Sequence, residues 1–259
     1  TVLYSVSLIS LLLIFAGFKR IHFLYLLFIS ELLSCCLDIA RWQPWEYQYL
    51  FIILIFICFR KNDFRKLTTI TIILCSLYLY SGIHKLNGGF LYSVWEKMIL
   101  KSFLGFSWAE IKSYNLHYVG VLIPTVEIIA GIGLLFKNIR KYAAVFLILM
   151  HTFIIVFLSP VGVDYNIVVL PWNVAMLLIL WSLYIQKPVA FTTSHIFKKY
   201  NLLVMFFWFV LPALSFLELW GGYMSSKLYS GNTVHLNICL RSNNKYKALE
   251  EFISTKSNS

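Results

Sequence analysis

Long apolar runs separated by short polar stretches dominate this chain. A helix that crosses a bilayer needs about 20 mainly apolar residues. Eight runs approach that length: 2–18, 21–38, 47–60, 67–84, 117–136, 141–159, 165–186 and 201–220. The third run is short, and it needs tilt or neighbouring helices to span. The pattern predicts an all-α, multi-pass transmembrane bundle of about eight spans.

Two parts of the chain lie outside this pattern. The stretch between spans four and five, residues 87–115, mixes aromatic, charged and apolar residues and is too polar to span. We expect a re-entrant or surface-lying segment there, on the outer side, with protein or water around its backbone. After the last run the sequence becomes more polar. The chain is therefore expected to form a membrane bundle over 1–220 and a short extracytoplasmic tail over 221–259.

Composition supports lipid as the main solvent. The 259 residues are 60% hydrophobic and 13% charged, whereas a soluble domain carries about 25% charged residues. The mean hydropathy is +0.77. Five cysteines are present without a CxxC spacing, so we expect no metal site and no disulfide framework. Membrane lipids are the first partners that this composition predicts.

Basic residues mark one side of the membrane. With eight spans, alternate loops collect twelve Lys and Arg residues together with a single acid, Asp63. These basic residues are Lys19, Arg20, Arg60, Lys61, Arg65, Lys66, Lys137, Arg140, Lys141, Lys187, Lys198 and Lys199. The positive-inside rule assigns those loops to the cytoplasm, which leaves both termini extracytoplasmic in a cell membrane, expected to be a bacterial inner membrane. The net charge of +11 thus reflects loops at a membrane surface, and no nucleic acid is expected as a partner.

Several ionisable or polar side chains fall inside or at the ends of the apolar runs. They are Glu31, His84, Lys85, Glu127, His151, Trp172 and Asn173. Such groups are costly in lipid and commonly face the bundle interior or a wet cavity, where they carry function. Each also has a structural interpretation. Lys85 can snorkel at a span end, His151 can serve helix packing, and Glu127 can pair with a neighbour.

Two outer-side stretches concentrate further polar and aromatic groups. The first runs from Asp38 to Tyr49, where Arg41 is placed to pair with an acid and Pro44 fixes a turn. The second leads to His84 and Lys85. A lysine in a partly apolar pocket can act as a base, because burial disfavours its charged form. Their shared side of the membrane predicts one outer cavity lined by both stretches.

In this order the two stretches resemble the membrane domain of vitamin K-dependent γ-carboxylases and of their bacterial relatives, the HTTM family. The family pattern Tyr-Phe-x-Ala-Gly-x-x-Lys-Leu is matched at Tyr80, Ser81, Gly82, Lys85 and Leu86, with Phe90 at a later aromatic position. The family pattern that comes earlier in the chain is Asp-x-x-x-Trp-Asn-Asn-His-x-Tyr-x-Tyr. It is matched here at Asp38, Trp42, Gln43, Tyr47 and Tyr49. A later span with a histidine, here His151, is also similar. The resemblance covers roughly residues 1–220.

The resemblance implies a chemistry. In the carboxylases the matching lysine deprotonates a vitamin K quinol, so Lys85 would be the base here. We take Lys85, His84 and His151 as candidate catalytic residues. The candidate pocket for a quinone, a quinol or a bound lipid is formed by Asp38, Arg41, Trp42, Gln43, Tyr47, Tyr49, Trp172 and Asn173.

The chain also departs from the family. Pro44 and Trp45 stand where the family has Asn-His, and only residues 221–259 follow the last expected span. We therefore expect neither the lumenal domain of the animal enzymes nor protein γ-carboxylation. Two functions stay open: an enzyme acting on a quinone or another lipid-soluble substrate, and a non-catalytic subunit or assembly factor of a larger membrane complex. The aromatic segment 87–115 would then contact other membrane subunits, because aromatic side chains mark interfaces.

Overall fold

The computed structural model describes residues 2–163, 166–186 and 191–231, and every regular element in these ranges is a helix. The first half contains α1 (Val2–Phe15), α2 (Arg20–Leu37), η1 (Ile39–Arg41), α3 (Pro44–Cys58), α4 (Asp63–Lys85), η2 (Phe90–Phe103), α5 (Trp108–Ser113) and α6 (Leu116–Val119). The second half contains α7 (Leu122–Gly133), α8 (Arg140–Leu158), η3 (Ile167–Val169), α9 (Leu170–Leu180), η4 (Trp181–Gln186), η5 (Thr193–His195), η6 (Lys199–Asn201), α10 (Leu202–Met205), η7 (Phe206–Val210), α11 (Leu211–Ala213), η8 (Leu214–Leu217) and η9 (Tyr223–Ser225).

Six helical ranges are long and apolar enough to cross a membrane, so the chain has the architecture of a multi-pass membrane protein. These ranges are Arg20–Leu37, Asp63–Lys85, Leu116–Gly133, Arg140–Leu158, Ile167–Gln186 and Lys199–Leu217. Each corresponds to one of the eight apolar runs. The other two runs form α1 and α3, which have 14 and 15 residues. The expectation of eight crossings stays a prediction.

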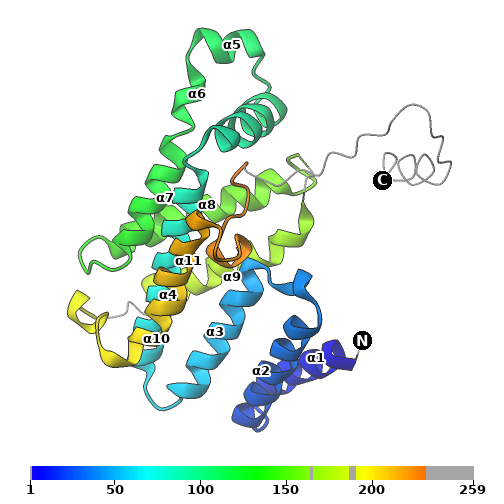
Figure 1. The fold of residues 1–259 in the computed structure, drawn as a ribbon, viewed down its shortest axis with the longest axis vertical. Coiled ribbons are helices and arrows are strands. Elements are labelled where there is room, and N and C mark those ends of the chain that lie inside the picture. The colour runs from blue at the N-terminus through cyan, green and yellow to red at the C-terminus, as the bar shows by residue number, and fades with distance from the viewer. Residues whose placement is uncertain (1, 164–165, 187–190, 232–259) are drawn as a thin grey trace, which may run out of the picture.

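Helix α4 is the central element of the bundle (Figure 1). Within its apolar window 83% of the residues are buried, and α3, α7, α10 and η7 pack around it. A helix that is enclosed in this way has to satisfy its own polar groups. Thr68, Thr69 and Thr71 do so by donating their hydroxyls to backbone carbonyls four residues earlier, at 2.8–2.9 Å.

The first two helices form a hairpin beside the bundle (Figure 1). Gly17 turns the chain between them with a φ of +81°, a conformation that favours glycine. Ser7 of α1 and Ser30 of α2 hydrogen-bond at 2.8 Å, which is typical of small polar residues at membrane helix contacts. The hairpin reaches the bundle through α2, which packs on α3.

The polar segment between spans four and five folds into η2 and α5, and with α6 it rises above one end of the bundle (Figure 1). η2 is a wide helix, and the amide of Leu104 bonds the carbonyl of Ile99 five residues back. Its apolar face and Ile111 form a second core with Phe157, Leu158 and Val169.

The described part of the predicted tail, residues 221–231, packs back onto the bundle. The side-chain amide of Asn87 donates to the carbonyl of Ser230 at 2.8 Å, and η9 contacts α3 and α4. The rest of the predicted tail, 232–259, lies outside the described residues. The boundary at residue 220 therefore marks a change of composition along the chain.

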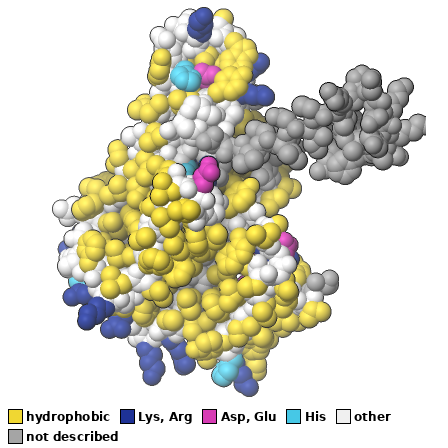
Figure 2. Space-filling view, in the orientation of Figure 1, with side chains coloured by type: hydrophobic (Ala, Val, Ile, Leu, Met, Phe, Trp, Pro, Cys, Tyr) yellow, Lys and Arg dark blue, Asp and Glu magenta, His cyan; other side chains and the backbone are white. Residues whose placement is uncertain are grey.

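Lysine and arginine side chains gather at the end of the molecule opposite to η2 and α5, others lie at the η2–α5 end, and a broad apolar band separates the two (Figure 2). This is the distribution that the positive-inside rule uses, and the orientation in the cell remains a prediction. Arg140 is an exception among these surface cations, because its side chain is buried. Its guanidinium donates to the carbonyl of Phe191 at 2.9 Å and lies 3.9 Å from that ring's centroid.

Candidate functional site

One face of α4 carries three polar side chains toward the bundle interior. Tyr78, Ser81 and Lys85 follow one another at spacings of three and four residues, which places them in a row along a helix. Tyr78 and Ser81 are buried, and the side chain of Lys85 is 15% exposed. The row faces α7 and α8, and each of these helices supplies a polar partner.

Two glycines allow α4 and α7 to approach closely. A Cβ at Gly82 would lie 2.5 Å from Ile128 Cγ1 and 2.7 Å from the carbonyl oxygen of Pro124. A Cβ at Gly131 would lie 2.6 Å from Tyr78 Cβ. Small residues at a helix contact in lipid let the backbones pack tightly, and this fixes which side chains face each other.

The close approach brings Lys85 onto Glu127. Lys85 Nζ lies 2.7 Å from Glu127 Oε2 and 3.0 Å from Oε1, and it donates to Ser81 Oγ at 2.8 Å. The side chain of Glu127 is 3% exposed. The ammonium therefore does not snorkel, and Glu127 has the partner that a carboxylate inside an apolar helix requires.

A second chain of hydrogen bonds runs from α4 through α8 to α9. The Tyr78 hydroxyl lies 2.8 Å from His151 Nε2, and His151 Nδ1 lies 2.7 Å from Asn173 Oδ1. Asn173 Nδ2 donates to the carbonyl of Val169 at 2.8 Å, so its oxygen faces the imidazole as an acceptor. This network assigns the proton of the ring to Nδ1 and makes Nε2 the acceptor for Tyr78.

The two groups form one polar cluster, which we call the Lys85–His151 cluster: Tyr78, Ser81, Lys85, Glu127, His151 and Asn173. Tyr78 and Ser81 lie three residues apart on the same face of α4, which places the two groups next to each other along that helix. Four helices, α4, α7, α8 and α9, contribute to it. Three of the predicted site residues thus come together: Lys85, His151 and Asn173.

Other predicted residues lie elsewhere. His84 points to a different face of α4, where Ser215 Oγ lies 3.1 Å from its Nε2 and Phe216 stacks on its ring. Tyr47 is buried and donates to the carbonyl of Phe207 at 3.1 Å. Trp172 donates from Nε1 to Gln48 Oε1 at 2.8 Å, and this joins α9 to α3.

The loop before α3 is largely exposed. Asp38 and Arg41 form an ion pair at 3.7 Å with side chains 54% and 48% exposed, and Asp38 caps the short η1. Gln43 donates to the carbonyl of Ala40, and Trp42 packs edge-on against Tyr47. None of these contacts joins the loop to Lys85, and a cavity shared by the loop and Lys85 stays a prediction.

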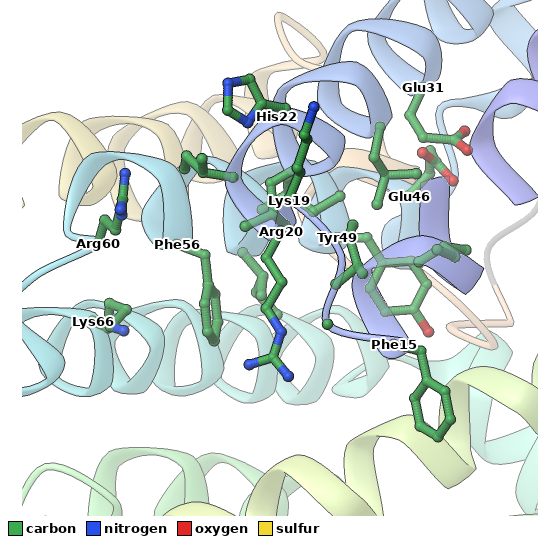
Figure 3. A pocket seen from close by; sticks show the side chains of 18 residues that line it. Phe15, Lys19, Arg20, His22, Glu31, Glu46, Tyr49, Phe56, Arg60 and Lys66 are labelled. Carbon is green, nitrogen blue, oxygen red and sulfur yellow. The ribbon is translucent and has the colours of Figure 1, made fainter. Parts of the chain in front are cut away.

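A cavity of about 1310 Å³ lies between the hairpin and α3–α4, and Tyr49 and Glu46 line it (Figure 3). None of its lining residues belongs to the Lys85–His151 cluster. Among the described residues no group of three or more His, Cys, Asp or Glu side chains is placed to hold a metal ion.

Sequence reasoning placed Glu127 among the intramembrane ionisable groups but did not assign it to the site. The missing link was its pairing with Lys85, 42 residues earlier in the chain. The available signal was that each is a lone charge of opposite sign in neighbouring apolar runs. Tyr78 and Ser81 were detectable by their helical spacing from Lys85.

Comparison with protein-family models, with curated proteins and with solved structures finds no match for this chain. The interpretation of the site therefore rests on its residues and geometry.

Proposed function

We propose that this chain is a membrane-embedded enzyme that acts on a lipid-soluble substrate such as an isoprenoid quinol, with Lys85 and Glu127 as its proton-transfer pair. The observation that carries the proposal is the buried contact of 2.7 Å between the two side chains. Ionisable groups within membrane helices are commonly functional. The substrate class comes from the resemblance to the carboxylase membrane domain.

The pair supplies a base without losing a proton to solvent. Transfer of a proton from Lys85 Nζ to Glu127 yields a neutral amine, and that amine can accept a proton from a substrate hydroxyl. Lys85 is the last residue of α4 and is 15% exposed, so the approach is from the end of that helix.

The His151 side of the cluster positions the pair. Tyr78 and Asn173 hold the imidazole from both ring nitrogens, so its orientation is fixed. Tyr78 lies on the same face of α4 as Ser81, which accepts from Lys85 Nζ, so these fixed dipoles adjoin the ion pair. Preorganised dipoles stabilise charge that changes during a reaction.

The decisive variant is Lys85→Arg. Arginine keeps the positive charge opposite Glu127 but does not release its proton at ordinary pH. We expect folded protein that has lost quinol deprotonation by roughly 10²–10⁴-fold, the usual contribution of a general base. The assay follows oxidation of a reduced menaquinone analogue in an air-saturated detergent solution of the purified protein, with dioxygen as the electron acceptor.

Lys112→Arg, at an exposed position of α5, is the matched control and should keep full activity. A wild-type rate in Lys85→Arg would show that Lys85 is not the base. Absence of any quinol turnover by the wild-type protein would show that a quinol is not the substrate.

A second function has its own supporting observation. Tyr114 and Tyr118, on the raised segment of α5 and α6, are 70% and 71% exposed. Exposed aromatic side chains favour a contact with another protein, as in a non-catalytic subunit of a membrane complex. The two functions separate experimentally: Tyr114→Ser with Tyr118→Ser lowers the mass of the native complex only if this segment is an interface, and Lys85→Arg leaves that mass unchanged.

A further inference from the structure

The groove between the α1–α2 hairpin and α3–α4 has a polarity that runs along its length. Its volume of about 1310 Å³ exceeds the roughly 300–1,000 Å³ of most small-molecule sites. Its walls are mainly aliphatic and aromatic, with Leu24, Ile52 and Phe56 among the lining residues. A long, largely apolar groove of this size suits an amphiphile with long chains.

One end of the groove is basic. Lys19, Arg20, Arg60 and Lys66 line it, and Figure 3 places Arg60 and Lys66 away from the two glutamates. Lys66 is bonded to Asp63 at 2.6 Å. For Lys19, Arg20 and Arg60 no ion pair is present among the described residues. This end therefore carries a surplus of positive charge without an internal counter-ion.

The other end is acidic. The carboxyl groups of Glu31 and Glu46 face each other there, and Tyr49 lies beside them (Figure 3). A second anionic group would be repelled at this end. The charges thus give any bound amphiphile a single orientation, with its anionic head at the arginines.

We propose that this groove binds an anionic phospholipid, with its phosphate at the end that Arg20 and Arg60 line and its acyl chains along α2 and α3. Basic pockets between membrane helices on the cytoplasmic side bind anionic head groups, and the sequence assigns these loops to that side. A zwitterionic lipid fits less well, because its ammonium group would meet the surplus cations. The lipid fills the space between the hairpin and the bundle and ties them together.

The test titrates purified full-length protein in detergent micelles with dioleoyl-phosphatidylglycerol or dioleoyl-phosphatidylcholine and follows the thermal midpoint. Phosphatidylglycerol should raise the midpoint more strongly. Arg20→Gln with Arg60→Gln should weaken phosphatidylglycerol binding roughly 30-fold, from about 1 kcal/mol for each cation near an anionic head group. Both side chains are exposed, so the variant should fold.

The charge-matched control is Lys61→Gln with Lys198→Gln, which removes two exposed cations outside the groove. Its affinity should stay at the wild-type value. An equal loss of phosphatidylglycerol affinity in the control would show that general surface charge causes the effect, and it would overturn the proposed site. Equal affinity of the wild type for the two lipids would overturn the choice of an anionic lipid.

Two further arms test the acyl chains. Ile52→Trp keeps every charge but fills the wall of the groove, so it should abolish stabilisation by phosphatidylglycerol. Retained stabilisation would place the lipid outside the groove. Glycerol 3-phosphate, which has the head-group phosphate without chains, should not raise the midpoint. Stabilisation equal to that by the lipid would identify a soluble phosphate compound as the ligand and refute the proposal.

Discussion

The ion pair between Lys85 and Glu127 makes an asymmetric prediction about stability. Lys85→Met removes the ammonium and leaves a carboxylate that is 3% exposed. At 2.7 Å and an effective dielectric constant of about 20, the attraction is roughly 6 kcal/mol before desolvation is subtracted. Removal of one partner of a buried pair commonly costs about 3–5 kcal/mol. We expect that loss for Lys85→Met.

The reverse change should cost less. Glu127→Leu leaves an ammonium, but Lys85 ends α4 and is already 15% exposed, so its side chain can turn toward the head groups. The double variant Lys85→Met with Glu127→Leu removes both charges and keeps the apolar volume. Replacement of buried pairs in this way is often neutral or stabilising. We expect the double variant within about 1 kcal/mol of the wild type or above it.

Reversible unfolding in mixed micelles, followed by far-ultraviolet circular dichroism, measures all four proteins of this cycle. Lys112→Met, at an exposed lysine, is the control and should change stability by less than about 0.5 kcal/mol. The coupling free energy between positions 85 and 127 should reach about 3 kcal/mol, the upper end for residues in contact. Additive effects of the two single variants would show that the side chains are not paired and refute the reasoning.

Two further predictions concern local geometry. Gly131→Ala places a Cβ 2.6 Å from Tyr78 Cβ, so it should destabilise the fold by about 1–3 kcal/mol in the same unfolding assay. Gly88→Ala is the control and should be close to neutral, because a Cβ there would have no atom within 4 Å. Hydrogen bonds from the Ser107 hydroxyl and amide hold the pKa of the Glu110 carboxyl below its ordinary 4.5. The ionised carboxyl therefore stabilises α5 above pH 4.5, and this stabilisation is lost as the pH falls through the lowered pKa. Hydrogen exchange of the α5 amides, corrected for the intrinsic effect of pH, should show less protection in Glu110→Gln than in the wild type near neutral pH. The difference should vanish in acid, where the wild-type carboxyl is protonated; a difference that persists unchanged in acid would contradict this assignment.

Much of the architecture followed from hydropathy alone. Lipid selects for long apolar runs whatever those runs later contact, so six of the predicted spans reappear as helices within a few residues of their expected ends. The same rule singled out Lys85, Glu127 and His151, because a charged or polar group in lipid stands out before its partner is known. The runs that became α1 and α3 are shorter helices; the sequence marked the third run as short but did not separate the first from the others.

Pairing was decided only by the tertiary structure. A lone lysine at the end of an apolar run predicts snorkelling as readily as an ion pair. The close packing at Gly82 and Gly131 sets the rotation of α4 against α7 and brings Glu127 to Lys85, and hydropathy carries no information on that rotation.

The groove beside the hairpin was also decided by the tertiary structure. Its basic residues come from the turn before α2 and the ends of α3 and α4, and its two glutamates come from α2 and α3. The sequence predicted that these cations lie at one membrane surface. The tilt and separation of four helices decided that they line one space, because those quantities depend on side-chain packing between segments far apart in the chain.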